Sequence, residues 1–131
     1  LEPLDRIRTA TETLIAEAGH RGCDIVVMEV ADGILQRETA ALIADPWFAQ
    51  LISGLVFACA DAVAAVGGVM HLARLGLVPD ALTGLVSCSP MAASEAGSAP
   101  ALPVLTRENL SDPAEATGFA LRAGLGREKA A

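Results

Sequence analysis

Apolar residues along this chain alternate between helical spacing and short continuous runs. Near the start, side chains three and four positions apart form one face of a helix that Gly19 can close. That face comprises Leu4, Ile7, Thr11, Leu14, Ile15 and Ala18. A continuous run rich in β-branched residues follows at Ile25–Val30, and Gly33 ends it. A run of this length and composition is typical of a strand that is buried on both faces of a parallel sheet.

The same alternation continues to the end of the chain. The pattern predicts helices at 36–44, from 46 onward, at 61–75, at 91–96 and at 112–124, and further strands at 55–58, 82–86 and 102–106. Asp61 has a side chain suited to capping a helix, and Pro46 suits a first helical position. Pro103 cannot donate a hydrogen bond to a sheet ladder, which places the last strand near an edge.

Strands separated by helices imply βαβ crossovers and parallel pairing. We therefore predict a single α/β domain over residues 1–131, in which helices on both sides cover a mainly parallel sheet of about four strands, a three-layer α/β/α arrangement. Ligands in such folds bind beyond the carboxyl ends of the strands. Those ends fall in four loops, at 29–33, 59–61, 87–90 and 106–109.

Charge and composition narrow the function classes. The formal net charge is −7, the opposite of what a broad nucleic-acid surface needs, so we expect no nucleic-acid partner. The longest apolar stretch, at 51–60, contains Ser53 and Gly54 and falls short of the ~20 residues that cross a bilayer, so we expect no membrane partner. No secretory signal opens the chain, which starts at Leu1 rather than methionine. The three cysteines have no C-x-x-C spacing, which favours reduced thiols and a cytoplasmic location.

The loop after the first predicted strand has the strongest candidate chemistry. Glu29 ends the apolar run and Asp32 follows three residues later. Two carboxylates there suit a Mg²⁺ ion that keeps several waters and is shared with phosphate. Gly33 would let the backbone approach a ligand closely, and the forked guanidinium of Arg37 could bind a carboxylate or phosphate. The alternative is a solvated strand end, with Asp32-Gly33 as a plain turn and Arg37 as a surface residue.

Histidine and cysteine offer weaker candidates. His20 and Cys23 have the spacing of a zinc-binding pair, but a zinc site needs three or four ligands and His71 is the only other histidine. Cys59 or Cys88 could in principle pair with His71 as a nucleophile and base. Because His71 is expected in the middle of a helix, away from the strand ends, small buried thiols are the better interpretation.

The segment Asp24–Gly33, which reads DIVVMEVADG, resembles the Walker-B-like strand of dethiobiotin synthetase and related P-loop amidoligases. In that family an apolar strand led by aspartate ends in Val-Glu-Gly-Ala-Gly-Gly. The likeness continues through the strand at 54–58, the helix at 61–75, the Gly-Leu-Val-Pro turn at 76–79, and the strands at 84–88 and 103–106. It thus covers most of the chain from Asp24 to Thr106.

The resemblance implies an ATP site with Mg²⁺, in which Glu29 is the metal ligand. The loop from Asp32 to Arg37 would face the substrate or the γ-phosphate. Ser87, Cys88 and Thr106 would lie on the side of the nucleotide base, with Cys88 in place of a base-contacting asparagine. Such a site would help to transfer a γ-phosphoryl group to a carboxylate.

One family feature is missing from this sequence. It contains no G-x-x-x-x-G-K-S/T loop, and its only lysine is Lys129. The amides and lysine of that loop provide most of the phosphate binding. We therefore expect the chain to be the carboxy-terminal part of a larger nucleotide-binding domain, with the first strand and the phosphate loop upstream of Leu1, and to be inactive alone.

Two other classes stay open. One is a non-catalytic α/β module that binds a small ligand or a partner subunit, including a second copy in a homodimer. The other is a response-regulator receiver, in which Glu29 would have to replace the phosphorylated aspartate. That class also expects a lysine after a later strand, which this sequence lacks.

Overall fold

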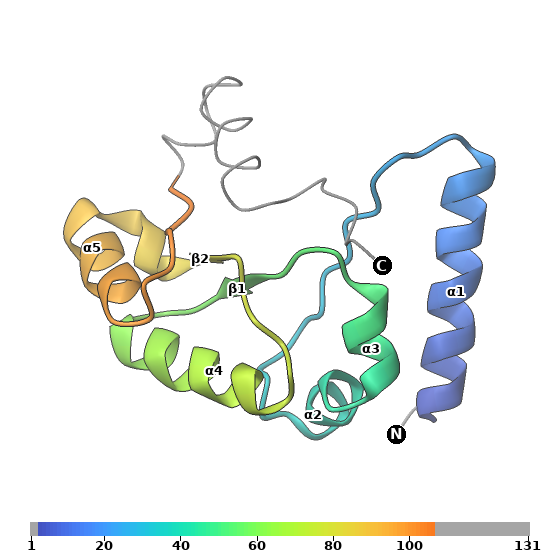
Figure 1. Ribbon diagram of the computed structural model, residues 1–131, viewed down its shortest axis with the longest axis horizontal. Helices are drawn as coiled ribbons and strands as arrows, with labels where there is room; N and C mark the ends of the chain where they lie inside the picture. The colour runs from blue at the N-terminus through green and yellow to red at the C-terminus, as the bar shows by residue number, and fades with distance from the viewer. Residues whose placement is uncertain (1–2, 107–131) are drawn as a thin grey trace. The chain divides into compact units, whose positions relative to one another are not determined.

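The computed structural model describes residues 3–106, which fall into two compact units divided between Phe48 and Ala49 (Figure 1). The first unit contains α1 (Leu4–His20), α2 (Arg37–Ile43) and the start of α3 (Pro46–Leu51). The second contains β1 (Val56–Ala58), α4 (Ala62–Arg74), β2 (Ala81–Thr83), the 3-10 helix η1 (Leu85–Cys88) and α5 (Pro90–Ser98). The helix predicted at 112–124 lies outside the described residues.

Helix α1 forms as predicted, and every position of its predicted apolar face except Leu14 is half-buried. None of its residues is buried, and Leu14 is 69% exposed. Arg8 forms an ion pair with Asp45, and its guanidinium lies 5.6 Å from the centroid of the Trp47 ring. The indole of Trp47 donates to Glu12 Oε1 at 3.0 Å. The hydrogen bond from Arg8 holds the pKa of the Asp45 carboxyl below its ordinary value.

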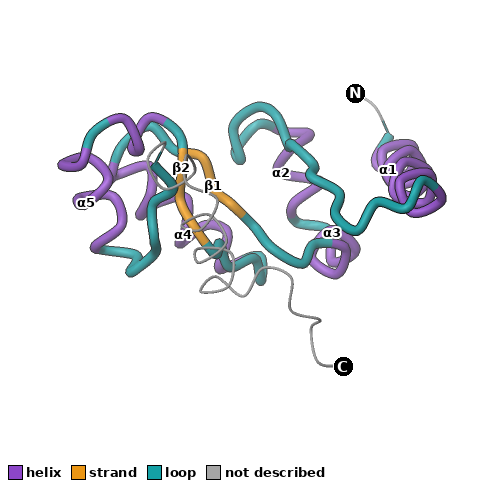
Figure 2. The backbone as a smooth tube through the Cα atoms, turned by 90° about the horizontal axis from the view of Figure 1, so that it is seen from above, coloured by secondary structure: helices purple, strands orange, loops and turns teal. Residues whose placement is uncertain are grey.

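The prediction of a buried strand at Ile25–Val30 is wrong for the described chain. The whole segment between α1 and α2 is loop and turn (Figure 2). Ile25 is 78% exposed and Val27 is 91% exposed. Within residues 3–106, no backbone group from 24 to 30 forms a hydrogen bond. An extended segment needs a neighbouring strand to pair its N–H and C=O groups, and the described residues pair none with it.

In the second unit, β1 and β2 pair in parallel, with Phe57 opposite Leu82. A parallel bridge joins Leu82 to Val104 on the other side of β2. There the Leu82 N–H donates to the Pro103 carbonyl at 2.9 Å, and the Leu105 N–H donates to the Leu82 carbonyl at 2.8 Å. The chain is therefore a mixed α/β protein with a small parallel sheet. Residues 3–106 do not form the predicted four-stranded sheet between two helical layers.

The strand predicted at 82–86 ends early, because β2 stops at Thr83 and the chain turns into η1. Gly84 causes this change, since its φ of 95° lies in the left-handed region that interrupts a strand. The strand predicted at 102–106 is reduced to the single bridge at Val104. The strand predicted at 55–58 and the helices predicted between 36 and 96 are confirmed, with small shifts at their ends.

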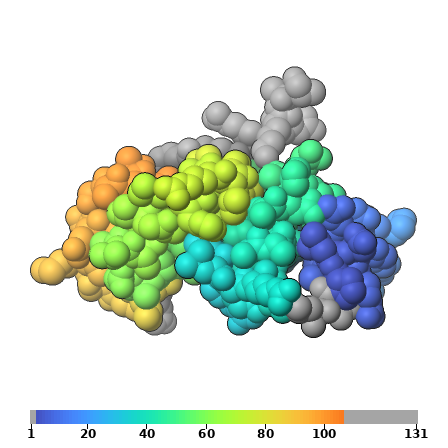
Figure 3. All heavy atoms as spheres, turned by 90° about the horizontal axis from the view of Figure 1, so that it is seen from below, coloured from blue at the N-terminus to red at the C-terminus, as the bar shows by residue number. Residues whose placement is uncertain are grey.

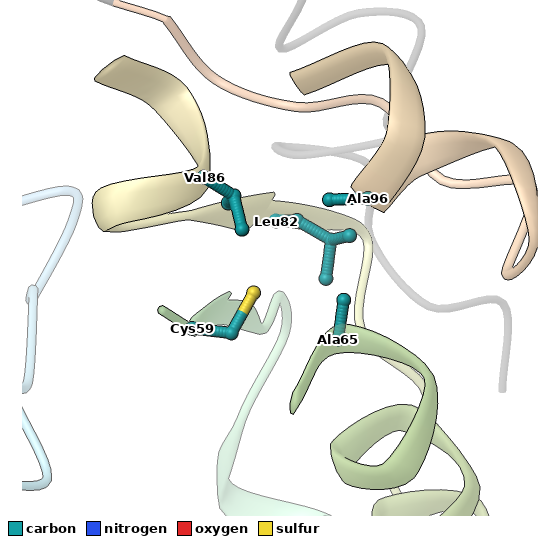
Figure 4. Close-up of a cluster of buried hydrophobic side chains, with 5 residues drawn as sticks. All are labelled: Cys59, Ala65, Leu82, Val86 and Ala96. Atoms are coloured by element: carbon teal, nitrogen blue, oxygen red, sulfur yellow. The ribbon is translucent and has the colours of Figure 1, made fainter. Parts of the chain in front are cut away.

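Leu82 is the centre of the core of the second unit. Figure 4 shows its side chain between Ala65 of α4 and Ala96 of α5, with Cys59 and Val86 beside it. Leu82, Ala65, Val86 and Ala96 are fully buried. Burial of a leucine side chain contributes about 1.5–3 kcal/mol. The alanines bring the helices close to the sheet, as expected for a core with few aromatic residues.

The two adjacent glycines of α4 lie in different surroundings. A Cβ added at Gly68 would lie 2.3 Å from ring carbons of Phe57, whereas one added at Gly67 would have no described atom within 4 Å. Close packing against a neighbour therefore accounts for Gly68 but not for Gly67. Asp61 caps this helix as predicted, since its carboxylate accepts from the Ala64 N–H at 2.7 Å.

Alanine substitutions at these two glycines should have opposite effects on the free energy of unfolding. Gly67→Ala should raise it by up to about 1 kcal/mol, because alanine is the better helix former and the new methyl meets no described atom. Gly68→Ala should lower it by about 1–3 kcal/mol, because the new methyl collides with Phe57. Urea denaturation of the two variants measures this difference. Equal effects would contradict the packing of Phe57 on Gly68.

Candidate functional site

The residues predicted to bind metal and phosphate lie on the loop that precedes α2 and on the first residue of that helix. Glu29 and Asp32 are exposed, and neither side chain forms an ion pair or hydrogen bond within residues 3–106. Asp32 has a φ of 67°, in the left-handed region that aspartate tolerates better than most residues. The Gly33 carbonyl accepts from the Gln36 N–H at 2.8 Å, which closes a turn. Arg37 is the exposed first residue of α2.

Gln36 and Thr39 hold this loop in place, although the sequence pattern predicts no role for either residue. Gln36 Oε1 accepts from the backbone N–H groups of Glu38 at 2.9 Å and Thr39 at 3.0 Å, so it caps α2. The Thr39 side chain is buried, and its hydroxyl donates to the Ala31 carbonyl at 3.2 Å. Glutamine is not among the usual capping residues, so the local pattern did not point to this cap.

The loop carboxylates do not form a metal cage by themselves. Within residues 3–106, no group of three or more His, Cys, Asp and Glu side chains could hold a metal ion. This also leaves His20 and Cys23 without the further ligands that zinc needs. Magnesium is commonly bound by one or two carboxylates together with water and phosphate oxygens. Binding of Mg²⁺ by Glu29 and Asp32 would therefore need water and phosphate oxygens as further ligands, and it stays a prediction from the sequence.

In the second unit, the loops that follow β1 and β2 meet at the carboxyl edge of the sheet. The Cys59 N–H donates to the Thr83 carbonyl at 2.9 Å, and the Val86 N–H donates to the Cys59 carbonyl at 3.4 Å. A Cβ at Gly84 would lie 2.7 Å from the Cys59 carbonyl oxygen. The approach of these two backbones therefore requires glycine at position 84. The parallel pattern predicts such a meeting of loops at one edge.

The three residues predicted for the base side differ in their surroundings. Ser87 is half-buried, and its hydroxyl donates to the Gly84 carbonyl at 2.7 Å. Cys88 is exposed at the end of η1. Thr106 is half-buried and directly follows Leu105, which hydrogen-bonds to β2. All three belong to segments that run past the carboxyl edge of the same small sheet.

Cys59 lies at this edge as a structural thiol. It is 8% exposed, and its Sγ lies 3.8 Å from the Thr83 carbonyl oxygen. Burial raises the pKa of the Cys59 thiol, and the nearby Asp61 carboxylate raises it further. A neutral, buried thiol is a poor nucleophile. The interpretation as a small buried thiol is thus confirmed for Cys59 and wrong for Cys88, which is exposed.

Asp80 fixes the opposite edge of the sheet, a role that was not predicted from the sequence. Its carboxylate accepts from the Leu55 N–H at 2.7 Å, and its own N–H donates to the Leu55 carbonyl at 2.8 Å. This pair joins the segments that enter β1 and β2. Proline commonly marks a turn, so the Pro79-Asp80 pair just before β2 is the sequence feature that could have pointed to the role of Asp80. Because Asp80 lies at the amino end of the strands, it positions the sheet rather than a ligand.

Comparison of the chain with protein-family models, with curated proteins and with solved structures finds no match. The relationship to the P-loop amidoligases therefore stays a prediction from the sequence motifs. Across the described range, 3–106, no helix combines the length and the apolar character that crossing a membrane requires.

The approach of Gly84 to Cys59 can be tested against Gly76, which also has a positive φ, 77°, but where an added Cβ would meet no atom of the described residues within 4 Å. Gly76→Ala should lower the free energy of unfolding by about 1–2 kcal/mol, because of its left-handed backbone alone. Gly84→Ala should cost a further ~1–3 kcal/mol, because the new methyl also collides with the Cys59 backbone. Urea denaturation gives both values. Similar losses for the two variants would refute the close approach at the carboxyl edge.

Proposed function

We propose that this chain supplies the magnesium-binding and base-side part of an ATP site of the P-loop amidoligase type. Glu29 and Asp32 ligate Mg²⁺, and Gly33 and Arg37 face the phosphates or the substrate. Ser87, Cys88 and Thr106 border the nucleotide base. The phosphate-binding loop comes from a segment outside this sequence, so residues 1–131 are inactive by themselves.

The observation that carries this proposal is the exposed, unpaired run that leads to Glu29. Val27 is 91% exposed, and Ile25 is 78% exposed, although both have the composition of an interior strand. Such a run needs a strand beside it for its backbone and apolar cover for both faces. A larger domain that contains the phosphate-loop strand meets both needs. We expect the complete domain to have the mainly parallel sheet of about four strands in three α/β/α layers.

The geometry of the second unit supports the base-side assignment. Ligand sites of parallel sheets lie beyond the carboxyl ends of the strands, and the loops of Cys59 and Gly84 touch at that edge. Ser87 and Cys88 follow directly in η1. The exposed thiol of Cys88 and the half-buried Thr106 are therefore at the edge where a ligand is expected.

Within such a site, this chain contributes charge and position. A bound Mg²⁺ neutralises the charge that develops on the phosphates. The carboxylates of Glu29 and Asp32 would hold one side of the ion and leave its other positions to water and phosphate oxygens. The forked guanidinium of Arg37 would hold the γ-phosphate or a substrate carboxylate in one orientation.

A non-catalytic α/β module is the second candidate, and the missing phosphate loop favours it. A site without that loop loses most of its phosphate-binding amides and its lysine. Such a module would bind a small ligand or a partner subunit. It would melt at the same temperature with and without Mg-ATP and would form a dimer whose fraction rises with concentration.

Glu29→Gln tests the proposed function in the product of the complete reading frame. The substitution removes a metal-binding charge from an exposed side chain, so turnover with Mg-ATP should fall by at least about 100-fold, while the melting temperature stays the same. Asp24→Asn, which removes the exposed carboxylate at the other end of the run, is the matched control and should keep its turnover. Phosphate release and thermal melting measure the two effects.

Unchanged turnover in Glu29→Gln would remove Glu29 from the mechanism. A complete reading frame without a strand and a G-x-x-x-x-G-K-S/T loop would contradict the ATP site itself. A concentration-dependent dimer in that case would favour the non-catalytic module.

A further inference from the structure

Helix α4 is apolar on its outer face as well as on its inner face. The inner face holds the three buried residues of the helix, Ala65, Gly68 and Leu72. On the opposite side, Val63, Gly67 and Met70 recur at helical spacing, and Val63 is 82% exposed and Met70 55% exposed. A helix that is apolar all round is typical of one that is covered on both sides. Residues 3–106 cover the inner side and leave the outer side exposed.

A groove of about 500 Å³ extends this outer face toward α5. Figure 3 shows the two helices against each other on one face of the molecule. The lining is apolar apart from one carboxylate and consists of Ala62, Val63, Val66, Gly67, Glu95 and Ala99. Met91, one turn before Glu95 on α5, is also 81% exposed. A continuous exposed apolar surface of this kind indicates a site of protein association.

The charged residues among the groove lining and the outer face of α4 are Glu95 and Arg74, which have opposite signs. Glu95 lines the groove beside the first turns of α4, and Arg74 ends the helix four residues after Met70. Both side chains are exposed, and neither forms an ion pair within residues 3–106. A surface with one charge of each sign toward its two ends is complementary to a copy of itself turned end for end.

We propose that two copies of this chain associate through this surface, with their α4 helices antiparallel about a two-fold axis near Gly67. Val63 of each copy then lies opposite Met70 of the other. Arg74 of each copy reaches the end of α4 beside which Glu95 of the other copy lies, so the charge pair forms twice. A parallel arrangement would instead bring each charge against its own equivalent. This interface does not depend on the ATP site.

Gly67 allows the two helices to approach closely. A Cβ added at Gly67 would meet no described atom within 4 Å, so the backbone of α4 is open at the proposed centre of the interface. Small residues at a helix crossing let the side chains on either side of it interlock. The sequence has paired glycines at 67 and 68, and packing against Phe57 accounts only for Gly68. Contact with a second copy provides a reason for Gly67.

Other occupants explain this surface less well. A small polar ligand would find one carboxylate in an otherwise apolar groove and would leave Met70 exposed. A basic partner helix would match Glu95 but not Arg74, whereas a second copy matches both. The net charge of −7 opposes the approach of two copies, but at ~0.15 M salt such repulsion is largely screened beyond about 8 Å, so contacts within the interface decide the outcome.

Sedimentation of the 131-residue chain at several concentrations in ~0.15 M salt tests the proposal. The unaltered chain should form a dimer whose fraction rises with concentration. Val63→Asp should raise the dissociation constant at least about 10-fold, because it brings two carboxylates into apolar contacts. The monomer should keep its fold, since Val63 is exposed and a carboxylate in the first turn interacts favourably with the helix dipole.

Val27→Asp is the matched control. It adds the same charge at a side chain that is 91% exposed in the first unit, and it should change the dissociation constant by less than about 2-fold. A dimer that Val27→Asp weakens and Val63→Asp does not would assign the contact to the run Ile25–Val30 and overturn the proposal.

Charge reversals test the antiparallel arrangement. Arg74→Glu and Glu95→Arg should each raise the dissociation constant by about 3- to 10-fold, because each disrupts two symmetry-related pairs, and the double variant should recover the loss. If net charge alone controlled association, Glu95→Arg would instead strengthen the dimer, since it makes the chain less negative. That result, or a double variant without recovery, would refute the antiparallel pairing.

Two further outcomes overturn the proposal. One is a chain that stays monomeric at about 1 mM, where even weak specific association is detectable. The other is a melting temperature that falls in Val63→Asp by the same amount at every protein concentration, because this would mean that the chain itself covers the outer face of α4.

Discussion

The pairing of β2 on both of its edges is the constraint on which the second unit depends. Leu82 pairs with Phe57 in β1 on one side, and it exchanges hydrogen bonds with Pro103 and Leu105 on the other. Its side chain is fully buried between α4 and α5. Parallel neighbours cannot be joined by tight turns, so α4 and α5 are the connections that this pairing requires. The same pairing brings the loops of Cys59 and Gly84 to one edge, where ligands of parallel sheets bind.

The run Ile25–Val30 shows what happens when that constraint is not met. Its composition is more typical of a strand than that of β2, yet it is exposed, and within residues 3–106 its backbone is unpaired. The run and β2 differ in their hydrogen-bonding neighbours. Strand β2 pairs with β1 on one side and with the segment at Val104 on the other, whereas the described residues provide no such neighbour for the run. Unpaired backbone and exposed apolar side chains both disfavour an isolated strand, which accounts for the loop conformation of this run. This physical requirement, rather than the motif itself, is the main support for our proposal that the run belongs to a larger domain.

The sequence predicts the local features of the fold well and the long-range ones poorly. Helix α4 and its cap at Asp61 depend on neighbouring residues, so pattern and capping chemistry were enough. The early end of β2 depends on the approach of Gly84 to Cys59, and the contact of Asp80 with Leu55 joins residues 25 positions apart in the chain. No local pattern specifies such partners. For the candidate site, the sequence pattern placed Asp32 on a loop correctly but placed Glu29 at the end of a buried strand, whereas the structure has both residues on an exposed loop.

Amide hydrogen exchange along Ile25–Val30 tests most directly whether this run belongs beside a missing strand. The measurement compares residues 1–131 with the product of the complete reading frame, and the Leu82 amide, which is hydrogen-bonded in the sheet, serves as the internal reference. We predict that the amides of the run exchange without protection in the 131-residue chain and at least about 100-fold more slowly in the complete product. Protection already present in the dilute 131-residue chain, or absent from the complete product, would contradict this account.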